Sequence, residues 1–314
     1  PGTIFGAFQG ARVNGEDYIE AAIAAGAIAI VARPEASVKG VLHVADANPR
    51  RAFAALAARY FAPFPATTVA ITGTNGKTST AELARQLWQA AGHRAASIGT
   101  LGVTTGYDSV SPRDGTGGLT TPDVVTFLAT MAGLAREGIS HTAFEASSHG
   151  LDQYRTEGLP VTAAAFTNLS RDHLDYHGTM ENYAAAKARL FDLSQAGARV
   201  INVDDAQGAQ WALQQAALGK APLVTTARTN EGRAIAGQCA ARHAATVRIE
   251  ACDIERHARG LRFRLTDSSV DALPTAGISM EIPLIGEFNV DNVLIAYGVL
   301  RALGVTADEA RRAL

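Results

Sequence analysis

The residues best suited to chemistry lie directly after an apolar run that ends at Ile71. The run leads into the sequence TGTNGKTS at positions 72–79. Glycines allow backbone N–H groups to face an anion closely, and the start of a helix adds partial positive charge there. Lys77 can then reach terminal phosphates, and the Thr78 hydroxyl can bind Mg²⁺. We interpret residues 73–79 as a nucleotide phosphate loop; the alternative is a glycine turn that happens to precede a lysine.

A carboxylate ends a second apolar run. Glu145 closes the run 142–145, and the sequence SSHG follows at 147–150. A carboxylate at the carboxyl end of a core strand, next to a phosphate loop, can hold Mg²⁺ directly or through water. Burying it without a cation would be costly. The alternative is a solvated acid at the end of a strand.

A third polar segment follows the apolar run 163–167. It reads NLSRDHLDYHG at 168–178 and contains Asp172 and His173. Carboxylate and imidazole are suitable ligands for a second divalent ion, whereas the absence of thiolates disfavours zinc. The alternative is a solvated loop with incidental histidines. Lys187 follows in an ordinary helical segment, and composition alone assigns it no function.

These residues need a scaffold, and the pattern of the chain predicts an α/β fold. Short apolar strands alternate with amphipathic helices, which is typical of a mostly parallel sheet with helices on both faces. Ligands bind such sheets outside the carboxyl ends of the strands. The expected strands are 4–8, 27–31, 68–71, 95–98, 142–145, 163–167, 199–203, 246–249 and 261–265, and the expected helices are 18–25, 50–61, 78–91, 183–191 and 292–303. Residues 220–285 are expected to form a small antiparallel addition.

A proline-rich break suggests two domains. Pro63-Phe64-Pro65 disfavours a helix and separates the first α/β stretch from the rest. We therefore predict a small N-terminal α/β domain at 1–65 and a P-loop-type central domain at 66–314.

The composition excludes several classes of protein. The chain has 314 residues, of which 47% are hydrophobic and 18% charged, and a formal net charge of -2. That is enough apolar material for a core, and the charge balance lacks the basic footprint of a nucleic-acid binder. No apolar run has the length of a membrane span, so we expect no membrane association. Two isolated cysteines fit a reducing cytoplasm.

Taken together, these segments resemble the Mur ligases, the amide ligases that assemble the cell-wall peptide, and most closely the tripeptide synthetases among them. The matches occur in the family's order and cover nearly the whole chain. The phosphate loop is shared with all Mur ligases and with folylpolyglutamate synthase, whereas SSHG at 147–150 and SRDHLDYH at 170–177 resemble the tripeptide synthetases alone. The other matches are TTP at 120–122, Lys187 and GEFNVDN at 286–292.

The resemblance implies a site for ATP and Mg²⁺. Thr78 and Glu145 would ligate one Mg²⁺, and His173 would help to hold a second. Lys187 resembles the family lysine that CO₂ carbamylates and that contacts the second metal, a reaction that requires a neutral amine and hence a lowered pKa. The implied catalytic residues are Lys77, Glu145, His173 and Lys187. The implied ATP-binding residues are Gly73, Thr74, Asn75, Gly76, Lys77, Thr78, Ser79, Asn289 and Asn292.

The resemblance also implies where the second substrate would bind. The N-terminal domain would hold the uridine end of a UDP-N-acetylmuramoyl dipeptide, and the central domain its peptide end. The family's earliest uridine-binding segment would precede Pro1, and its third domain, which brings the incoming amino acid, would follow Leu314. The implied substrate-binding residues are Ala11, Arg12, Val13, Thr120, Thr121, Ser147, Gln153 and Arg155.

The implied activity is an ATP-dependent amide ligase that adds a free amino acid, with meso-diaminopimelate favoured, to UDP-N-acetylmuramoyl-L-alanyl-D-glutamate through an acyl-phosphate. A homologue that adds L-lysine is one alternative. A folylpolyglutamate synthase-like ligase is another, and the SSHG segment and the N-terminal unit argue against it. A non-catalytic P-loop nucleotide-binding module is the third, and the histidine-rich loop argues against that.

Overall fold

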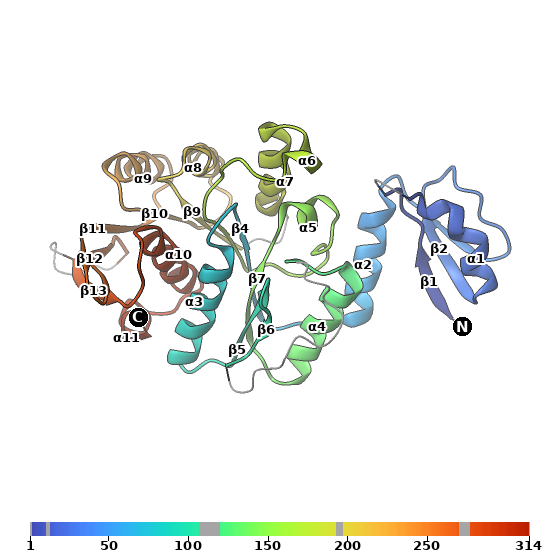
Figure 1. Cartoon of the computed structure of the whole chain (residues 1–314), viewed down its shortest axis with the longest axis horizontal. Coiled ribbons are helices and arrows are strands. Elements are labelled where there is room, and N and C mark those ends of the chain that lie inside the picture. Colours follow the sequence, from blue (N-terminus) through green and yellow to red (C-terminus); the bar gives the residue numbers. More distant parts are fainter. Residues whose placement is uncertain (1, 11–12, 107–119, 193–196, 270–276, 314) are drawn as a thin grey trace.

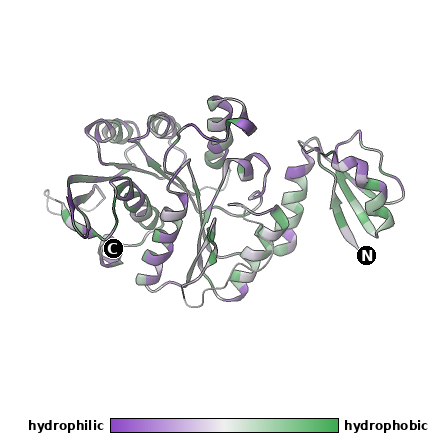
Figure 2. Ribbon diagram, viewed as in Figure 1, coloured by the Kyte–Doolittle hydropathy of each residue, from purple (hydrophilic) through white to green (hydrophobic). Residues whose placement is uncertain are grey.

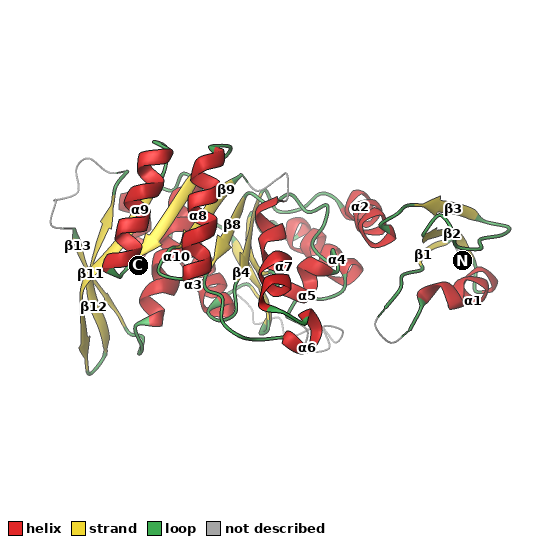
Figure 3. Cartoon of the chain, turned by 90° about the horizontal axis from the view of Figure 1, so that it is seen from above, coloured by secondary structure: helices red, strands yellow, loops and turns green. Residues whose placement is uncertain are grey.

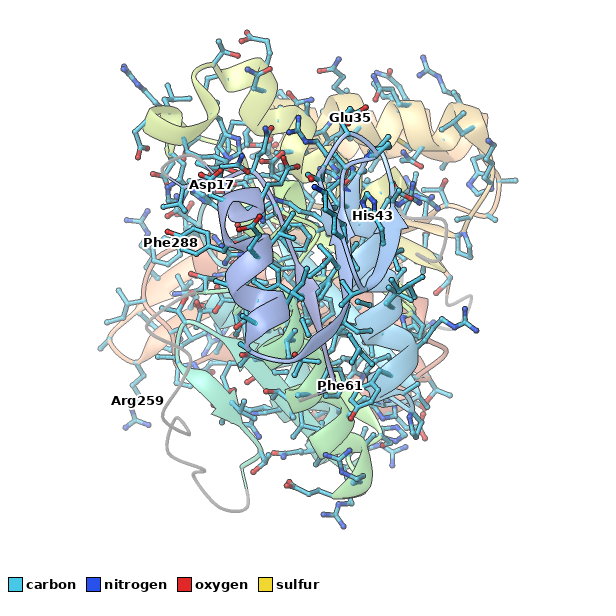
Figure 4. The ribbon with its side chains drawn as sticks, turned by 90° about the vertical axis from the view of Figure 1, so that its right-hand side faces the viewer. Asp17, Glu35, His43, Phe61, Arg259 and Phe288 are labelled. Atoms are coloured by element: carbon cyan, nitrogen blue, oxygen red, sulfur yellow. The ribbon has the colours of Figure 1, made fainter. Side chains whose placement is uncertain are left out.

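The computed structural model describes residues 2–10, 13–106, 120–192, 197–269 and 277–313. They form a small three-stranded unit at the N-terminal end and a larger α/β body, with helix α2 between them (Figure 1). Seen from the N-terminal end, the small unit stands in front of the body and carries Asp17, Glu35 and His43 (Figure 4). The predicted α/β class, with a small N-terminal unit and a mostly parallel central sheet, is confirmed.

The N-terminal unit is a parallel sheet covered by one short helix. Strand β2 lies in the middle and pairs in parallel with β1 and β3. Ile19 at the start of α1 packs with Ile30 of β2 in a small core of its own. The elements are β1 (Thr3–Gly6), a 3₁₀ helix η1 (Gly15–Tyr18), α1 (Ile19–Ala24), β2 (Ala27–Ala32), β3 (Leu42–Ala45) and α2 (Pro49–Phe61).

The body contains one sheet, in which ten strands of the described residues take part. Their order is β13-β12-β11-β10-β9-β8-β4-β7-β5-β6, and the stretch from β11 to β5 is parallel. The strands are β4 (Thr67–Thr72), β5 (Ala95–Gly99), β6 (Gly102–Thr104), β7 (His141–Glu145), β8 (Ala163–Phe166), β9 (Ala198–Asn202), β10 (Leu223–Ala227), β11 (Val247–His257), β12 (Gly260–Asp267) and β13 (Ile278–Ile282).

Strand β4 lies between β7 and β8, and the strands that follow it are placed on both of its sides. In open α/β sheets the crevice at such a switch in strand order is the usual ligand site. The loop after β4 is therefore in the place where this architecture predicts a bound ligand.

Helices cover both faces of the sheet, and the alternation of side chains along β4 explains why. Val69 and Ile71 belong to a core shared with α3 and α10, whereas Ala70 belongs to the core on the opposite face. Figure 3 shows helices on either side of the strands. The remaining helices are α3 (Lys77–Ala90), α4 (Val124–Arg136), α5 (Ser148–Asp152), α6 (Leu174–His177), α7 (Met180–Asp192), α8 (Ala206–Leu218), α9 (Asn230–Arg242), α10 (Phe288–Ala302) and α11 (Ala307–Ala313).

The region 220–285 differs from its expected form. Only β12 and β13 are antiparallel additions, because β10 pairs in parallel with both β9 and β11. Strand β10 is buried along its whole length, so its residues show no alternation of exposed and buried positions. Strand β8 is equally buried but is an unbroken apolar run, whereas Thr225 and Thr226 interrupt the run in β10, so β10 gives the weaker signal in the sequence.

Helix α2 packs on the body as well as on the small sheet. Ala57 and Ala58 belong to the same apolar core as Phe127 of α4, on the face of the sheet that also carries α7 and α8.

Figure 2 shows the apolar residues along the strands of the small unit and hydrophilic residues on outlying helices such as α6. Among the described residues, no helix combines the length and the apolar character needed to cross a bilayer.

The contact between α2 and the body gives a testable prediction. Gly158 has a φ of +80°, and a methyl group added there would lie 2.5 Å from the Cβ of Ala58. We expect Gly158→Ala to lower the free energy of unfolding by about 2–4 kcal/mol, because overpacking adds to backbone strain. Gly92→Ala is the matched control, since Gly92 has a φ of +87° with no atom within 4 Å. It should lose only about 1–2 kcal/mol from backbone strain. Equal losses in urea unfolding would contradict this packing.

Candidate functional site

The phosphate loop joins β4 to α3 and lies between two other elements. Gly76, directly before α3, has a φ of +83°. A side chain at Gly76 would collide with Asn292 of α10, and one at Gly73 would collide with Thr167, which follows β8. Gly73 is therefore required by the close approach of the segment after β8, and Gly76 mainly by its left-handed backbone. The open start of α3 directs its N–H groups and partial positive charge toward this loop.

Asn168 fixes the middle of the loop by three hydrogen bonds. The Asn75 N–H donates to Asn168 Oδ1 at 3.0 Å, and Asn168 Nδ2 donates to the Asn75 carbonyl at 3.2 Å. The Thr74 N–H donates to the Asn168 carbonyl at 2.8 Å. The end of β8 thus sets the shape of the loop that follows β4.

Two lysines converge on one carbonyl oxygen of the loop. Lys77 Nζ donates to the carbonyls of Gly73 and Thr74 at 3.0 and 2.8 Å. Lys187 Nζ, from α7, donates to the same Gly73 carbonyl at 2.8 Å. Lys187 is only 1% exposed, and its ammonium lies 4.5 Å above the Tyr183 ring. Residues separated by more than 100 positions therefore place two positive charges at one point.

This arrangement changes the acidity of both amines. Burial lowers the pKa of Lys187 to about 7, and the charge of Lys77 acts in the same direction, opposed by Asp172. Burial also lowers the pKa of Lys77, opposed by the charges of Glu145 and Asp172. Lys187 can therefore be present as a neutral amine near pH 7.

Glu145 lies at the carboxyl end of β7 and is 2% exposed. The Thr78 hydroxyl donates to its Oε1 at 2.8 Å, and the Thr100 N–H donates to the same oxygen at 2.8 Å. Among the described residues, its hydrogen-bond partners are neutral and it forms no ion pair. A buried carboxylate in such surroundings fits the approach of a cation.

The histidine-containing loop is more open. His173 has a φ of +50°, its side chain is 47% exposed, and its Nε2 lies 3.5 Å from Asp172 Oδ2. Its ring lies 4.9 Å from that of His149. Burial lowers the pKa of His149, which leaves this imidazole neutral at pH 7. The described residues hold no group of three or more His, Cys, Asp or Glu side chains that could bind a metal by themselves.

The residues expected to bind the peptide substrate are connected to Glu145. The Thr100 hydroxyl donates to Thr120 Oγ1 at 3.3 Å, and the Thr121 hydroxyl donates to the Glu145 carbonyl at 2.9 Å. The Ser147 N–H donates to Thr121 Oγ1 at 3.1 Å.

The connection continues to the end of α5. Arg155 Nη1 donates to the Thr121 carbonyl at 2.6 Å, and Arg155 Nη2 donates to Gln153 Oε1 at 2.8 Å. One series of hydrogen bonds therefore runs from Thr78 in the phosphate loop, through Glu145, to Arg155.

The two asparagines expected to bind ATP lie at the start of α10. Asn292 is buried, donates to Asn289 Oδ1 at 3.2 Å and accepts from the Thr80 hydroxyl at 3.4 Å. Asn289 donates to the Ile285 carbonyl at 2.8 Å. Phe288 beside it is 63% exposed (Figure 4). In the N-terminal unit Val13 is exposed, whereas Ala11 and Arg12 lie outside the described residues.

The geometry adds residues that sequence reasoning did not select. Thr100, just after β5, supports Glu145, and Asn168 supports the phosphate loop. Tyr183 bonds to Thr74 through their hydroxyl groups at 3.2 Å and lies beneath Lys187. Thr100 and Asn168 lie just after strands, and Tyr183 faces the phosphate loop from α7. The rule that ligands meet strand ends could have identified the first two.

Comparison with known proteins identifies the architecture. The family model described as the Mur ligase middle domain matches residues 71–300. A relative from Zymomonas mobilis, named UDP-N-acetylmuramoyl-L-alanyl-D-glutamate--2,6-diaminopimelate ligase, is 49% identical, with 100% of this chain and 59% of that protein covered. A relative of the same name from Bradyrhizobium diazoefficiens is 42% identical, with 99% and 59% covered. The chain thus spans about three fifths of the length of these curated relatives.

Solved structures agree with this result. A structure titled as UDP-N-acetylmuramoyl-L-alanyl-D-glutamate--2,6-diaminopimelate ligase matches with a TM-score of 0.80 at 29% identity, covering 98% of this chain and 58% of that one. The structure titled FPGS-AMPPCP complex matches with a TM-score of 0.55 at 15% identity, covering 85% and 67%, which shows a shared fold alone. The chain belongs to the Mur ligase family, and residues 71–300 match the middle domain of that family.

Proposed function

We propose that this chain is the ATP- and substrate-binding part of an amide ligase that adds meso-diaminopimelate to UDP-N-acetylmuramoyl-L-alanyl-D-glutamate. The observation that supports this best is the series of hydrogen bonds from Thr78 through Glu145 to Arg155. It joins a nucleotide phosphate loop to an array of residues suited to a peptide carboxylate. Relatives at 38–49% identity bear the name of that ligase. The proposal includes a cytoplasmic location.

In the proposed reaction, the carboxylate of the dipeptide attacks the γ-phosphorus of ATP and ADP leaves. The amine of the incoming amino acid then attacks the acyl carbon, phosphate leaves, and an amide forms. The start of α3 and Lys77 would bind the phosphates and reduce the repulsion between two anions that must approach. Arg155 would hold the substrate carboxylate, as a planar guanidinium does well.

The residues fit Mg²⁺, since Thr78 and Glu145 present a hydroxyl and a carboxylate side by side. Mg²⁺ usually takes one or two carboxylates and fills its other positions with phosphate oxygens and water, which agrees with so small a set of protein ligands. When bound, it would neutralise charge on the β- and γ-phosphates. His173, close to Asp172 on an open loop, is the proposed residue for a second ion.

Lys187 is proposed to be carbamylated by CO₂. The reaction forms a bond between the neutral amine and the carbon of CO₂ and releases one proton. Burial of Lys187 over the Tyr183 ring and a pKa lowered to about 7 support the neutral form that this reaction needs. We also propose that residues 1–65 hold the uridine end of the substrate, through Ala11, Arg12 and Val13, and that residues 66–314 form the catalytic unit.

The activity itself is tested in a protein that carries this chain at the relatives' full length. We expect phosphate release and an amide product that require ATP, the UDP-muramoyl dipeptide and meso-diaminopimelate together. L-Lysine in place of diaminopimelate should give little product. Product with L-lysine alone would change the assigned amino acid. No product with either, or product with a folate and glutamate, would overturn the proposed function.

Removing the charge of Lys77 should weaken nucleotide binding. We expect Lys77→Met to raise the dissociation constant of a non-hydrolysable ATP analogue with Mg²⁺ at least tenfold, because this ammonium is directed at the phosphate loop. Lys220→Met is the control, since Lys220 is exposed. Isothermal titration calorimetry on the 314-residue chain measures both. Equal dissociation constants for Lys77→Met and the unaltered chain would contradict a contact between Lys77 and the phosphates.

The lowered pKa of Lys187 predicts a dependence of stability on pH. Between its folded pKa of about 7 and the ordinary value of 10.5, the unfolded chain binds a proton that the folded chain does not. The contribution of Lys187 to stability therefore rises with pH in this window, by up to about 1 kcal/mol per pH unit. Urea unfolding in CO₂-free buffer from pH 7 to 9.5 should show this rise, and Lys187→Met should lack it. Parallel pH profiles of the two proteins would contradict the lowered pKa.

A further inference from the structure

Helix α5 ends in a left-handed turn at a residue that is not glycine. The Arg155 N–H donates to the Gly150 carbonyl at 2.8 Å, and the Tyr154 N–H donates to the Leu151 carbonyl at 3.3 Å. This pair of bonds is the Schellman motif, in which the left-handed position usually holds glycine. Tyr154 occupies it with a φ of +56°.

A tyrosine is disfavoured at this position, so the contacts of its side chain must compensate for the strain. Asn48 Nδ2 donates to the Tyr154 hydroxyl at 2.5 Å. The Arg189 guanidinium lies 3.9 Å from the centre of the Tyr154 ring. Asn48 caps the start of α2, and Arg189 lies on α7 two residues after Lys187. The tyrosine is thus held between the helix that reaches the N-terminal unit and the helix that carries the buried lysine.

The left-handed residue determines how its two neighbours are directed. Side chains at positions i and i+2 of a regular helix do not face each other. Here Gln153 Oε1 accepts from Arg155 Nε at 3.2 Å and from Nη2 at 2.8 Å, and Arg155 Nη1 reaches the Thr121 carbonyl. The reversal at Tyr154 is what allows Gln153 and Arg155 to meet and to point toward Thr121.

We propose that Tyr154 is a positioning residue for the peptide end of the substrate, and that Asn48 holds it in place from α2. The inference rests on the proposed function, in which Gln153 and Arg155 contact that substrate. The Asn48–Tyr154 hydrogen bond then links the part of the chain assigned to the uridine end with the residues assigned to the dipeptide carboxylate.

The test uses two variants that break the same hydrogen bond from opposite sides. Tyr154→Phe keeps the ring beside Arg189. Asn48→Ser keeps an N-cap oxygen for α2, because serine caps helices about as well as asparagine. In a protein that carries this chain at the relatives' full length, each should weaken binding of UDP-N-acetylmuramoyl-L-alanyl-D-glutamate roughly tenfold in calorimetry, and leave the affinity for an ATP analogue with Mg²⁺ unchanged. The double variant should bind like either single one, because the two changes remove one interaction.

Controls separate positioning from folding. Tyr60→Phe alters an exposed tyrosine of α2 and should bind both ligands normally. Tyr154→Gly should melt near the temperature of the unaltered chain, because relief of the backbone strain offsets the lost side-chain contacts, and should bind the muramoyl dipeptide weakly. In the absence of ligand, Asn48→Ser should speed hydrogen exchange of the amides at 151–159. The substitution lies outside this segment, so a faster rate would reflect a change in its structure.

The outcomes distinguish the two proposals. If the unaltered protein at the relatives' full length does not bind the muramoyl dipeptide, the proposed function fails, and hydrogen exchange alone decides whether Asn48 orders the turn. If that protein binds it and Tyr154→Phe and Asn48→Ser bind equally well, the positioning role is overturned and the proposed function stands. Unchanged exchange in Asn48→Ser also overturns the role.

Discussion

The structure depends on two ammonium groups that share the carbonyl oxygen of Gly73. Lys77 and Lys187 reach it from different helices; Lys187 is buried and Lys77 is half-buried. Burial lowers the pKa of both lysines, and the nearby charge of Lys77 lowers that of Lys187 further. An anion that enters between them relieves the repulsion between the two charges. The proposed affinity for phosphate and the proposed neutral amine both depend on the placement of these two lysines by β4, α3 and α7.

The sheet supplies the rest of the site because its parallel strands end at one edge. The residues after β4, β5, β7 and β8 meet there and bond to one another. No single loop contains the site, and a change in the register of one strand would displace a partner of Glu145 or of the phosphate loop. The helices α10 and α7 close the edge through Asn292 and Tyr183. A ligand at this edge contacts side chains fixed from several directions, which preorganises them.

Much of this could be predicted from the sequence, for identifiable reasons. The phosphate loop and Glu145 follow apolar strands, so local pattern located them. Lys187 could not be found in this way, since its burial depends on how α7 packs against Gly73, which lies 114 residues earlier. Resemblance to the Mur ligases, and not composition, singled it out. Strand β10 lacks both alternation and an unbroken apolar run, because Thr225 and Thr226 are buried in its middle. The role of Tyr154 depends on a left-handed backbone that residue types do not reveal.

Helix α2 has a consequence for the selection of ligands by size. It contacts β1 and β2 of the small sheet and also α4 beside the central sheet, so the two units are joined by a helix that packs on both. Thirteen residues of helix extend roughly 20 Å at 1.5 Å per residue. A molecule held by both units must span a nearly constant separation. A ligand whose two ends are too close together or too far apart would therefore contact only one of the two units, whatever its chemical groups.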